Sequence, residues 1–275
     1  MEPDRIRFAA VGDLHCTKGS VGTLRGLFAQ ASEAADALLL CGDLTDYGLP
    51  EEAHVLADEL ATASIPIVAV LGNHDFESDA QDEVRRILAD AGVQILDGEA
   101  CEIHGVAIAG AKGFAGGYGR GTLGSWGERA NKQFVNEAIQ EALKLESALA
   151  KLRTPHRLAV LHYSPIVATV QGEPVEIFPF LGTSRLEEPL IRHPVSAVVH
   201  GHAHRGCPEG KTVNGTPVYN VAMPLLKHTY PDRPPFRVLE LPAAAADVPR
   251  GPEHEASPVN PVPSRRNGAA LRDDQ

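Results

Sequence analysis

The chain has 275 residues, of which 43% are hydrophobic, and a formal net charge of −11. These values suit one large or two small soluble α/β domains, and no run approaches the roughly 20 apolar residues of a membrane-spanning helix. The acidic balance argues against binding of nucleic acid, whose phosphates favour a basic surface, but a phosphorylated small molecule held through metal cations remains compatible with it.

The N-terminal segment and the cysteines predict a cytoplasmic protein. Residues 1–13, MEPDRIRFAAVGD, run from a charged start into a strand pattern, without the basic head, apolar stretch and cleavage site of a signal peptide. The cysteines are far apart and form no CxxC pair, so we expect free thiols in a reducing compartment. They are Cys16, Cys41, Cys101 and Cys207.

Five apolar runs, each ending in polar residues, predict buried strands. Near-continuous apolar runs are typical of strands that are covered on both faces. The runs are Ile6–Asp13, Ala37–Asp43, Ile65–Asp75, His156–Pro165 and Val195–His204. In the last of them we expect the strand to break at Gly201, which leaves His200 buried on the strand side and not a metal ligand.

Helical patterns lie between several of these runs. PEEAHVLADELATA begins with Pro50 and two glutamates, which suit the first turn of a helix. SDAQDEVRRILADAG has Ser78 and Gln81 at capping-box spacing, and Asn131–Leu152 has apolar residues every three or four positions. Strands alternating with helices predict an α/β layered fold. The segments CEIHGVAIAGA and TPVYNVAM indicate additional antiparallel pairing.

Two stretches have no regular pattern. Gly110–Glu128 is dense in glycine and contains Tyr118, Arg120 and Trp126. A loop of this length is usually functional or disordered, so these side chains either contact the substrate from a flap or belong to an irregular surface loop. From Pro242 onward the chain is rich in proline, alanine and charge, so we predict a domain of residues 1–241 and a flexible tail of residues 242–275.

Residues that can bind metal ions follow all five predicted strands. Ligands of α/β sheets bind beyond the carboxyl ends of the strands. The residues there are Asp13, His15, Asp43, Asn73, His74, Asp75, His162, His202 and His204. Taken singly, the aspartates and the asparagine are ordinary turn residues. Together with the histidines they suit zinc, iron or manganese, and two adjacent ions bridged by one carboxylate account for their number.

The blocks GDLH, GDLTD, GNHD, a later histidine and GHAH occur in this order between Asp13 and His204. In this they resemble the calcineurin-like metallophosphoesterase superfamily. GDLTDYG and the full ligand set are similar to the branch that includes bacterial cyclic-nucleotide and glycerophosphodiester phosphodiesterases. The resemblance implies a four-layered αββα sandwich with mixed sheets and a dimetal site at the carboxyl ends of the strands.

The resemblance also implies a role for each residue of these blocks. Asp13, His15 and His204 would hold one metal ion, Asn73, His162 and His202 the other, and Asp43 would bridge the two. His74 would protonate or stabilise the leaving oxygen, with Asp75 orienting its ring. A hydroxide between the two ions would attack phosphorus. We expect Asp46 to bond the loop backbone.

The function expected from these features is hydrolysis of phosphodiester bonds, and also of phosphomonoesters, in small molecules. The chain has no arginine-containing extension of its second block like that of the superfamily's protein phosphatases, which argues against a phosphoprotein substrate. Two alternatives stay open, a nuclease and a non-catalytic scaffold on the same fold. The negative charge disfavours the first, and the complete ligand set disfavours the second. The sequence leaves the oligomeric state open, a homodimer included.

Overall fold

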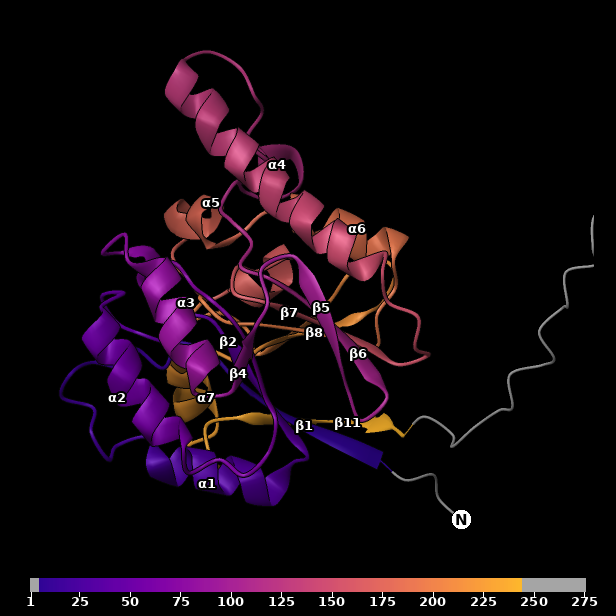
Figure 1. Cartoon of the computed structure of the whole chain (residues 1–275). Coiled ribbons are helices and arrows are strands. Elements are labelled where there is room, and N and C mark those ends of the chain that lie inside the picture. The colour runs from indigo at the N-terminus through magenta and orange to yellow at the C-terminus, as the bar shows by residue number, and fades with distance from the viewer. Residues whose placement is uncertain (1–4, 244–275) are drawn as a thin grey trace, which may run out of the picture. The chain divides into compact units, whose positions relative to one another are not determined.

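Residues 5–243, which the computed structural model describes, build two mixed β-sheets (Figure 1). The first sheet has the order β11-β1-β2-β3-β4 and the second the order β5-β6-β7-β8-β10-β9. The strands of the first are β1 (Arg5–Val11), β2 (Ala37–Cys41), β3 (Ile67–Val70), β4 (Val93–Ile95) and β11 (Arg237–Pro242). Those of the second are β5 (Glu99–Ile103), β6 (Val106–Ala111), β7 (Arg157–Leu161), β8 (Ala197–His200), β9 (Glu209–Lys211) and β10 (Pro217–Asn220).

Both sheets are parallel in the middle and antiparallel at an edge. Strands β1 to β4 run parallel and β11 pairs antiparallel with β1. In the second sheet β6, β7, β8 and β10 run parallel, whereas β5 and β9 pair antiparallel with their neighbours. The predicted strands and the additional antiparallel pairing are therefore confirmed, while β11 was not predicted.

Helices cover the outer faces of the two sheets and give four layers (Figure 1). Successive residues of β2 show how, because neighbouring side chains of a strand point to opposite faces. Leu38 and Leu40 pack with α1 (Arg25–Ala34), α2 (Pro50–Leu60) and α3 (Gln81–Asp90), whereas Leu39 packs between the sheets. On the far side α4 (Arg129–Leu149) and α6 (Glu187–Arg192) cover the second sheet. The αββα sandwich is confirmed.

The start of α1 is capped by a residue from α2. The carboxylate of Glu59 accepts hydrogen bonds from the backbone N–H groups of Gly22, Leu24 and Arg25, at 2.6, 2.8 and 3.1 Å. These are amides that a helix cannot satisfy by itself. Because the cap comes from 34 residues away in the sequence, no local pattern predicted α1.

The capping box predicted at the start of α3 is wrong. This helix begins at Gln81 with Ala80 as its N-cap, and its N-cap makes no side-chain hydrogen bond. The hydroxyl of Ser78 instead donates to the backbone carbonyl of Tyr47 at 2.6 Å, in a turn that precedes the helix. Ser78 therefore ties two loops together and does not cap the helix.

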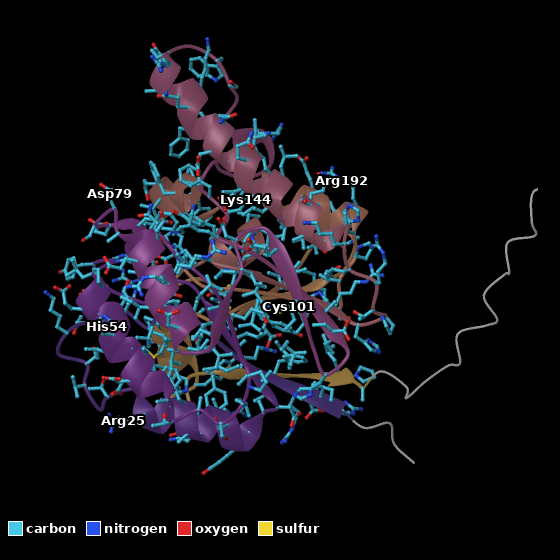
Figure 2. All side chains as sticks on the ribbon, in the orientation of Figure 1. Arg25, His54, Asp79, Cys101, Lys144 and Arg192 are labelled. Atoms are coloured by element: carbon cyan, nitrogen blue, oxygen red, sulfur yellow. The ribbon has the colours of Figure 1, made fainter. Side chains whose placement is uncertain are left out.

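The glycine-rich stretch overlaps β6 at its start and then runs as a loop with one short 3-10 turn, Gly119–Gly121. The loop is anchored to α4, because the buried carboxylate of Glu141 accepts from the N–H of Gly113 at 2.8 Å. Lys144 is also on α4 (Figure 2). It donates to the same carboxylate at 2.7 Å and to Asp97 at 2.9 Å.

The predicted tail lies outside the described residues from position 244 onward, and Pro242 is the last residue of β11. Among residues 5–243, no helix is both long and apolar enough to cross a membrane.

Candidate metal centre

The loops that follow β1, β2, β3, β7 and β8 meet at one edge of the two sheets. The loops after β1 and β2 are joined by hydrogen bonds from the N–H of Asp13 to the carbonyl of Gly42 and from the N–H of His15 to that of Asp43. The two sheets are linked here as well, because Gly12 forms a bridge with Ala222. The N–H of His74 donates to Oδ1 of Asp43 at 2.9 Å, and the N–H of Gly201 donates to the carbonyl of His162 at 3.2 Å. The five predicted strand ends therefore lie at one edge.

Left-handed backbone is concentrated in these loops. Asp13, His15, Asp43 and His202 have φ values of 58°, 45°, 47° and 70°. Such conformations are costly for residues other than glycine and persist where the surrounding structure enforces them. Here they turn each side chain back toward the shared edge.

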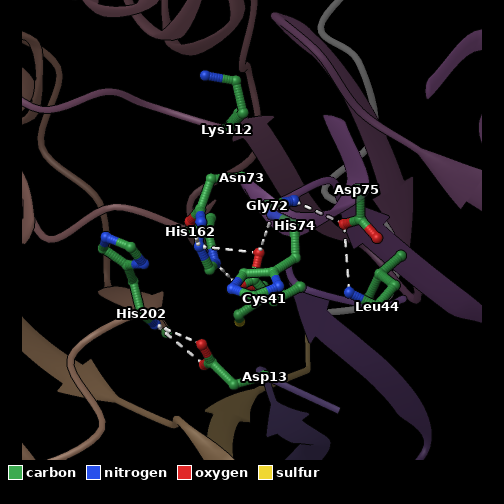
Figure 3. A network of polar contacts seen from close by, with 12 residues as sticks. Asp13, Cys41, Leu44, Gly72, Asn73, His74, Asp75, Lys112, His162 and His202 are labelled. Atoms are coloured by element: carbon green, nitrogen blue, oxygen red, sulfur yellow. Dashed lines mark hydrogen bonds and ion pairs between the residues drawn. The ribbon is translucent and has the colours of Figure 1, made fainter. Parts of the chain in front are cut away.

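Among the described residues, three groups of side chains could each hold a metal ion, and one of them, His15, Asp46 and His74, shares His15 with another. The two groups below contain the ligands expected from the sequence. In each group the three ligand atoms lie within 4.8 Å of one another. The first group is Asp13, His15 and His204, and the second is Asp43, His162 and His202. Asn73 joins the second group, because its Oδ1 lies 2.9 Å from Nε2 of His162 (Figure 3).

The carboxylate of Asp43, a member of the second group, also faces the first. Its Oδ2 is 3.8 Å from Nε2 of His15, and its Oδ1 is 3.3 Å from Nε2 of His162. Asp43 is 1% exposed, and its Oδ1 also accepts from the backbone N–H of His74 at 2.9 Å. One carboxylate therefore presents a different oxygen to a histidine of each group.

The histidine rings are oriented as metal ligands usually are. A ligating histidine donates its second ring N–H to a carbonyl or a carboxylate. Nδ1 of His162 lies 2.9 Å from the carbonyl of Cys41, and Nε2 of His202 lies 3.1 Å from that of Phe180. The other nitrogen of His162, Nε2, faces Oδ1 of Asn73 at 2.9 Å and Oδ1 of Asp43 at 3.3 Å, so these three atoms could share one cation.

His15 carries the clearest sign of a cation site. Its Nδ1 lies 3.1 Å from Oδ1 of Asp46, while its Nε2 is buried without a hydrogen-bond partner. A buried polar atom without a partner is rare and costly, and a metal ion at this nitrogen would satisfy it. The residues of both groups thus fit two metal ions.

Burial controls the charge of this cluster. It raises the pKa of Asp43 to about 7, and the neighbouring charge of Asp13 adds to this. For Asp13 burial also acts upward, but the hydrogen bond from His204 and nearby histidine charges outweigh it and lower the pKa. Burial lowers the pKa of His202 to about 3, which keeps its ring neutral and able to bind a metal. Burial of two neighbouring carboxylates costs free energy unless a positive charge, such as that of a metal ion, offsets their negative charge.

Glycines at the strand ends let these groups approach closely. A Cβ on Gly201 would lie 2.3 Å from Oδ2 of Asp13, and a Cβ on Gly72 would lie 2.2 Å from Oδ1 of Asp43. Both distances are far shorter than the contacts that a Cβ atom makes in proteins, so any side chain at these glycines of the GHAH and GNHD blocks would clash.

His74 stands beside the first group. Its ring meets the ring of His15 edge to face, with centroids 4.5 Å apart, and its side chain is 38% exposed. Nδ1 lies 2.6 Å from the backbone carbonyl of Asp46. This hydrogen bond and the charges of Asp43 and Asp46 raise the pKa of His74, although burial by itself acts in the opposite direction.

The prediction that Asp75 orients the ring of His74 is wrong. The buried carboxylate of Asp75 accepts from the backbone N–H groups of Gly72 and Leu44 (Figure 3). It also accepts from the backbone N–H and the hydroxyl of Thr45. The 3-10 turn His74–Phe76 directs Asp75 inward under the loop, so that the carboxylate fixes the loops after β2 and β3 to each other.

Asp46, which we expected to bond the loop backbone, does so through its main chain, because its N–H donates to the carbonyl of Cys16 at 3.1 Å. Its carboxylate accepts from His15, and its backbone carbonyl accepts from His74. The position of His200 is confirmed. It is the last residue of β8, it is fully buried, and its two ring nitrogens lie 2.8 Å from the carbonyl of Gly201 and from Oγ1 of Thr169.

The structure separates the two side chains predicted to contact substrate. Tyr118 packs against the buried cluster that contains Ala203, which lies between His202 and His204, and its hydroxyl donates to the carbonyl of Ser164 at 3.3 Å. Arg120 is exposed on the turn Gly119–Gly121. Only Tyr118 is therefore near the metal groups.

Two clefts and a lysine at this edge were not found from the sequence. One cleft of about 640 Å³ is lined by His204, Arg205 and His228 among others. Another, of about 520 Å³, is lined in part by Phe180. Lys112 directly follows β6, and its carbonyl accepts from the N–H groups of His162 and Tyr163. The strand-end rule would have found Lys112, since β6 is a parallel strand of the same sheet.

Comparison with solved structures gives the same fold. The phosphopantetheinyl hydrolase PptH of Mycobacterium tuberculosis is 13% identical, with a TM-score of 0.62 over 88% of this chain and 98% of that one. The protein TT1561 of Thermus thermophilus is 14% identical, with a TM-score of 0.50 over 81% and 92% of the two chains. GAP50, the anchor in the inner membrane complex of Plasmodium, is 14% identical, with a TM-score of 0.52 over 80% and 72%.

These likenesses concern the fold alone, and among curated proteins none matches the chain. The family model of the calcineurin-like phosphoesterases matches residues 6–206, a span that contains every candidate ligand from Asp13 to His204. The chain therefore belongs to the calcineurin-like phosphoesterase family and is a metallophosphoesterase, a hydrolase of phosphoester bonds.

Proposed function

We propose that this chain is a dimetal phosphodiesterase that hydrolyses small phosphodiesters and, less efficiently, phosphomonoesters. The observation that carries the proposal is the carboxylate of Asp43, whose two oxygens face a histidine of each ligand group, at 3.8 and 3.3 Å. Two ions sharing one carboxylate are a recurring device for cleavage of phosphate esters.

We assign the first ion to Asp13, His15 and His204 and the second to Asn73, His162 and His202, with Asp43 shared. Manganese, iron or zinc suits this mixture of imidazole, carboxylate and amide. When bound, such ions supply positive charge that lowers the pKa of a water molecule and stabilises charge on phosphoryl oxygens.

His74 is proposed as the donor of a proton to the leaving oxygen. Its ring is held through Nδ1 by the carbonyl of Asp46 at 2.6 Å, which leaves Nε2 as the free nitrogen of a half-exposed side chain. A positioned histidine suits this task, because it can carry a proton at neutral pH. Asp75 supports His74 indirectly, through the loop that its carboxylate fixes.

The cleft beside His204 is the proposed place for a polar, charged part of the substrate. Arg205 and His228 line this cleft together with His204 and offer donors to an anion. We retain Tyr118 as a wall of the substrate site and Arg120 as a contact from the exposed turn of the loop. The net charge of −11 speaks against a nucleic acid as the substrate.

We further propose that one catalytic domain, ending near residue 241, holds this site and that the protein is cytoplasmic. All four cysteines are free, as expected for a reducing compartment.

The proposal is tested with purified full-length protein after removal of metals with a chelator. Manganese, zinc or iron is returned, bound metal is counted by elemental analysis, and hydrolysis of bis-p-nitrophenyl phosphate and p-nitrophenyl phosphate is measured. We expect two ions per chain and faster hydrolysis of the diester.

Three other outcomes would contradict the proposal. A protein with two bound ions that hydrolyses neither ester would indicate a scaffold, and faster hydrolysis of the monoester would indicate a phosphatase. Degradation of single- or double-stranded DNA with manganese would indicate a nuclease.

A further inference from the structure

We propose that the cleft lined by Phe180 is a subsite for an apolar group, aryl or alkyl, carried by the substrate. The inference rests on the proposed function and specifies its substrate class, phosphoesters in which one organic group is apolar. It is carried by the composition of the cleft and by its continuity with the metal centre.

The cleft is almost wholly apolar. It measures about 520 Å³, within the range of small-molecule sites. Its lining consists of Gly116, Gly121, Leu123, Ala130, Asn131, Phe134, Pro179 and Phe180. The one polar side chain in this lining, Asn131, already donates its amide hydrogens to the carbonyls of Gly124 and Trp126, at 3.2 and 2.6 Å. A polar ligand would lose its water here without gaining partners, whereas an apolar one would not.

One residue belongs to both the cleft and the metal centre. The side chain of Phe180 is 59% exposed and forms part of the lining, and its backbone carbonyl lies 3.1 Å from Nε2 of His202. A group seated against Phe180 would therefore contact the residue whose carbonyl holds the ring of His202, a candidate ligand of the second ion.

The opposite wall is tied to the centre as well. The N–H of Gly116 donates to the carbonyl of Pro179 at 2.7 Å, which joins the glycine-rich loop to the segment of Phe180. Tyr118, two residues farther along this loop, packs in the buried cluster of Leu181 and Ala203. Both walls of the cleft thus continue into the loops that carry the ligands.

Exposed apolar side chains extend from the cleft along the same segment. Val175, Ile177 and Phe180 are 68%, 38% and 59% exposed. A gathering of exposed apolar side chains marks a site that binds an apolar partner. The cleft beside His204 differs, because Arg205 and His228 line it. The two clefts therefore favour a substrate with one apolar and one polar end.

The test uses phenylphosphonate and methylphosphonate, two anions that the enzyme cannot hydrolyse and that carry one organic group each. Their Kd values for the metal-loaded protein are measured by calorimetry. The variants are Phe180→Ala and Leu123→Asn, and Ile191→Ala is the control, because Ile191 is an exposed apolar residue of α6 outside the cleft. Circular dichroism verifies folding, and light scattering gives the mass of each protein.

We expect phenylphosphonate to bind the wild type about tenfold more tightly than methylphosphonate, a difference typical of one buried aromatic group. Phe180→Ala and Leu123→Asn should each remove most of this preference. Leu123→Asn should leave methylphosphonate binding unchanged, and Ile191→Ala should leave the binding of both anions unchanged. Equal affinities in the wild type, or a preference that survives both variants, would overturn the subsite.

Two results separate this inference from the proposed function. A protein that hydrolyses bis-p-nitrophenyl phosphate and shows no preference for phenylphosphonate loses the subsite alone. A protein that prefers phenylphosphonate and hydrolyses no ester retains the cleft and loses the function. If the wild type is a dimer that Phe180→Ala dissociates without changing the preference, the cleft is a contact between two copies, and the subsite is overturned.

Discussion

Asp46 accepts a hydrogen bond from Nδ1 of His15 at 3.1 Å, so that His15 stands between two carboxylates of one loop. Its other nitrogen, Nε2, lies 3.8 Å from Oδ2 of Asp43. Asp43 and Asp46 are three residues apart in the block GDLTD. The second aspartate of the block thus fixes the ring and its tautomer, and the first contributes to the cation site.

Asp46→Ala should weaken metal binding without preventing folding. Loss of the carboxylate frees the ring of His15 to rotate, and removal of such a partner typically reduces metal affinity by about 10–100-fold. The affinity is measured by competition with a chelator of known strength. Asp58→Ala, which changes an exposed aspartate of α2, is the control. Unchanged metal affinity in Asp46→Ala would show that the ring of His15 is held by other contacts.

His74→Ala should reduce turnover while both ions stay bound. A histidine that donates a proton in the transition state contributes about 10²–10⁴-fold to the rate. The measurements are kcat for bis-p-nitrophenyl phosphate and metal content by elemental analysis. His54→Ala on the exposed face of α2 is the matched control (Figure 2). If His74→Ala loses both ions, the assigned role is contradicted and His74 contributes to metal binding.

Gly201→Ala should disrupt the metal centre, because the structure leaves no room for the added methyl group. The added Cβ would lie 2.3 Å from Oδ2 of Asp13, so the carboxylate or the loop of His202 must move. We expect loss of one bound ion per chain and of most activity. Gly26→Ala is the control, because a Cβ on Gly26 in α1 meets nothing within 4 Å. A fully active Gly201→Ala variant would mean that this loop adapts at little cost.

Glu59 should make folding stability depend on pH. Burial acts to raise its pKa, but hydrogen bonds from Gly22, Leu24 and Arg25 prevail and lower it below the usual 4.5. A carboxylate with a lowered pKa in the folded state stabilises the fold above its unfolded pKa, and this contribution is lost as pH falls through the folded value. Glu59→Gln should therefore reduce the free energy of unfolding at pH 7 by about 2 kcal/mol, since it weakens hydrogen bonds to a charged group.

The measurement is urea unfolding of the wild type and of Glu59→Gln at pH 7 and at a series of acidic pH values below 4.5, over which the carboxylate of Glu59 becomes protonated in the folded protein. The difference between the two proteins should shrink in acid. Glu33→Gln changes an exposed glutamate of α1 and serves as the control. A difference that stays constant with pH would show that the carboxylate of Glu59 is not the source of the effect.

Structural features that depend on neighbouring residues in the chain could be predicted from the sequence. A buried strand needs an apolar run, and its end needs a glycine or a polar residue, so the strands and the edge where they end could be predicted. The end of β8 at His200 is an example. The contacts of Asp75 could not be predicted, because the block GNHD alone does not show which aspartate faces the ring of His74. The 3-10 turn His74–Phe76 directs Asp75 inward, and Asp46 from another loop holds the ring.

Contacts between residues that are distant in the chain could not be predicted from the sequence either. The cap of α1 comes from Glu59, and the carbonyl of Phe180 holds the ring of His202 from 22 residues away. Such pairs leave no periodic signal, because their contact depends on how whole elements pack. The two clefts and the partner of His15 belong to this class.

The layered α/β class, the strand ends and the residue types available for metal binding could be predicted from the chain alone, because they follow from hydrophobic periodicity and from the order of the blocks. Three features could be seen only in the folded protein: Asp43 faces a histidine of each group, Asp46 and not Asp75 holds the histidines, and two clefts, lined by Phe180 and by Arg205, lie beside the centre. The physical reason is that ligand geometry is set by loops from separate strands, which meet only after the two sheets have packed together.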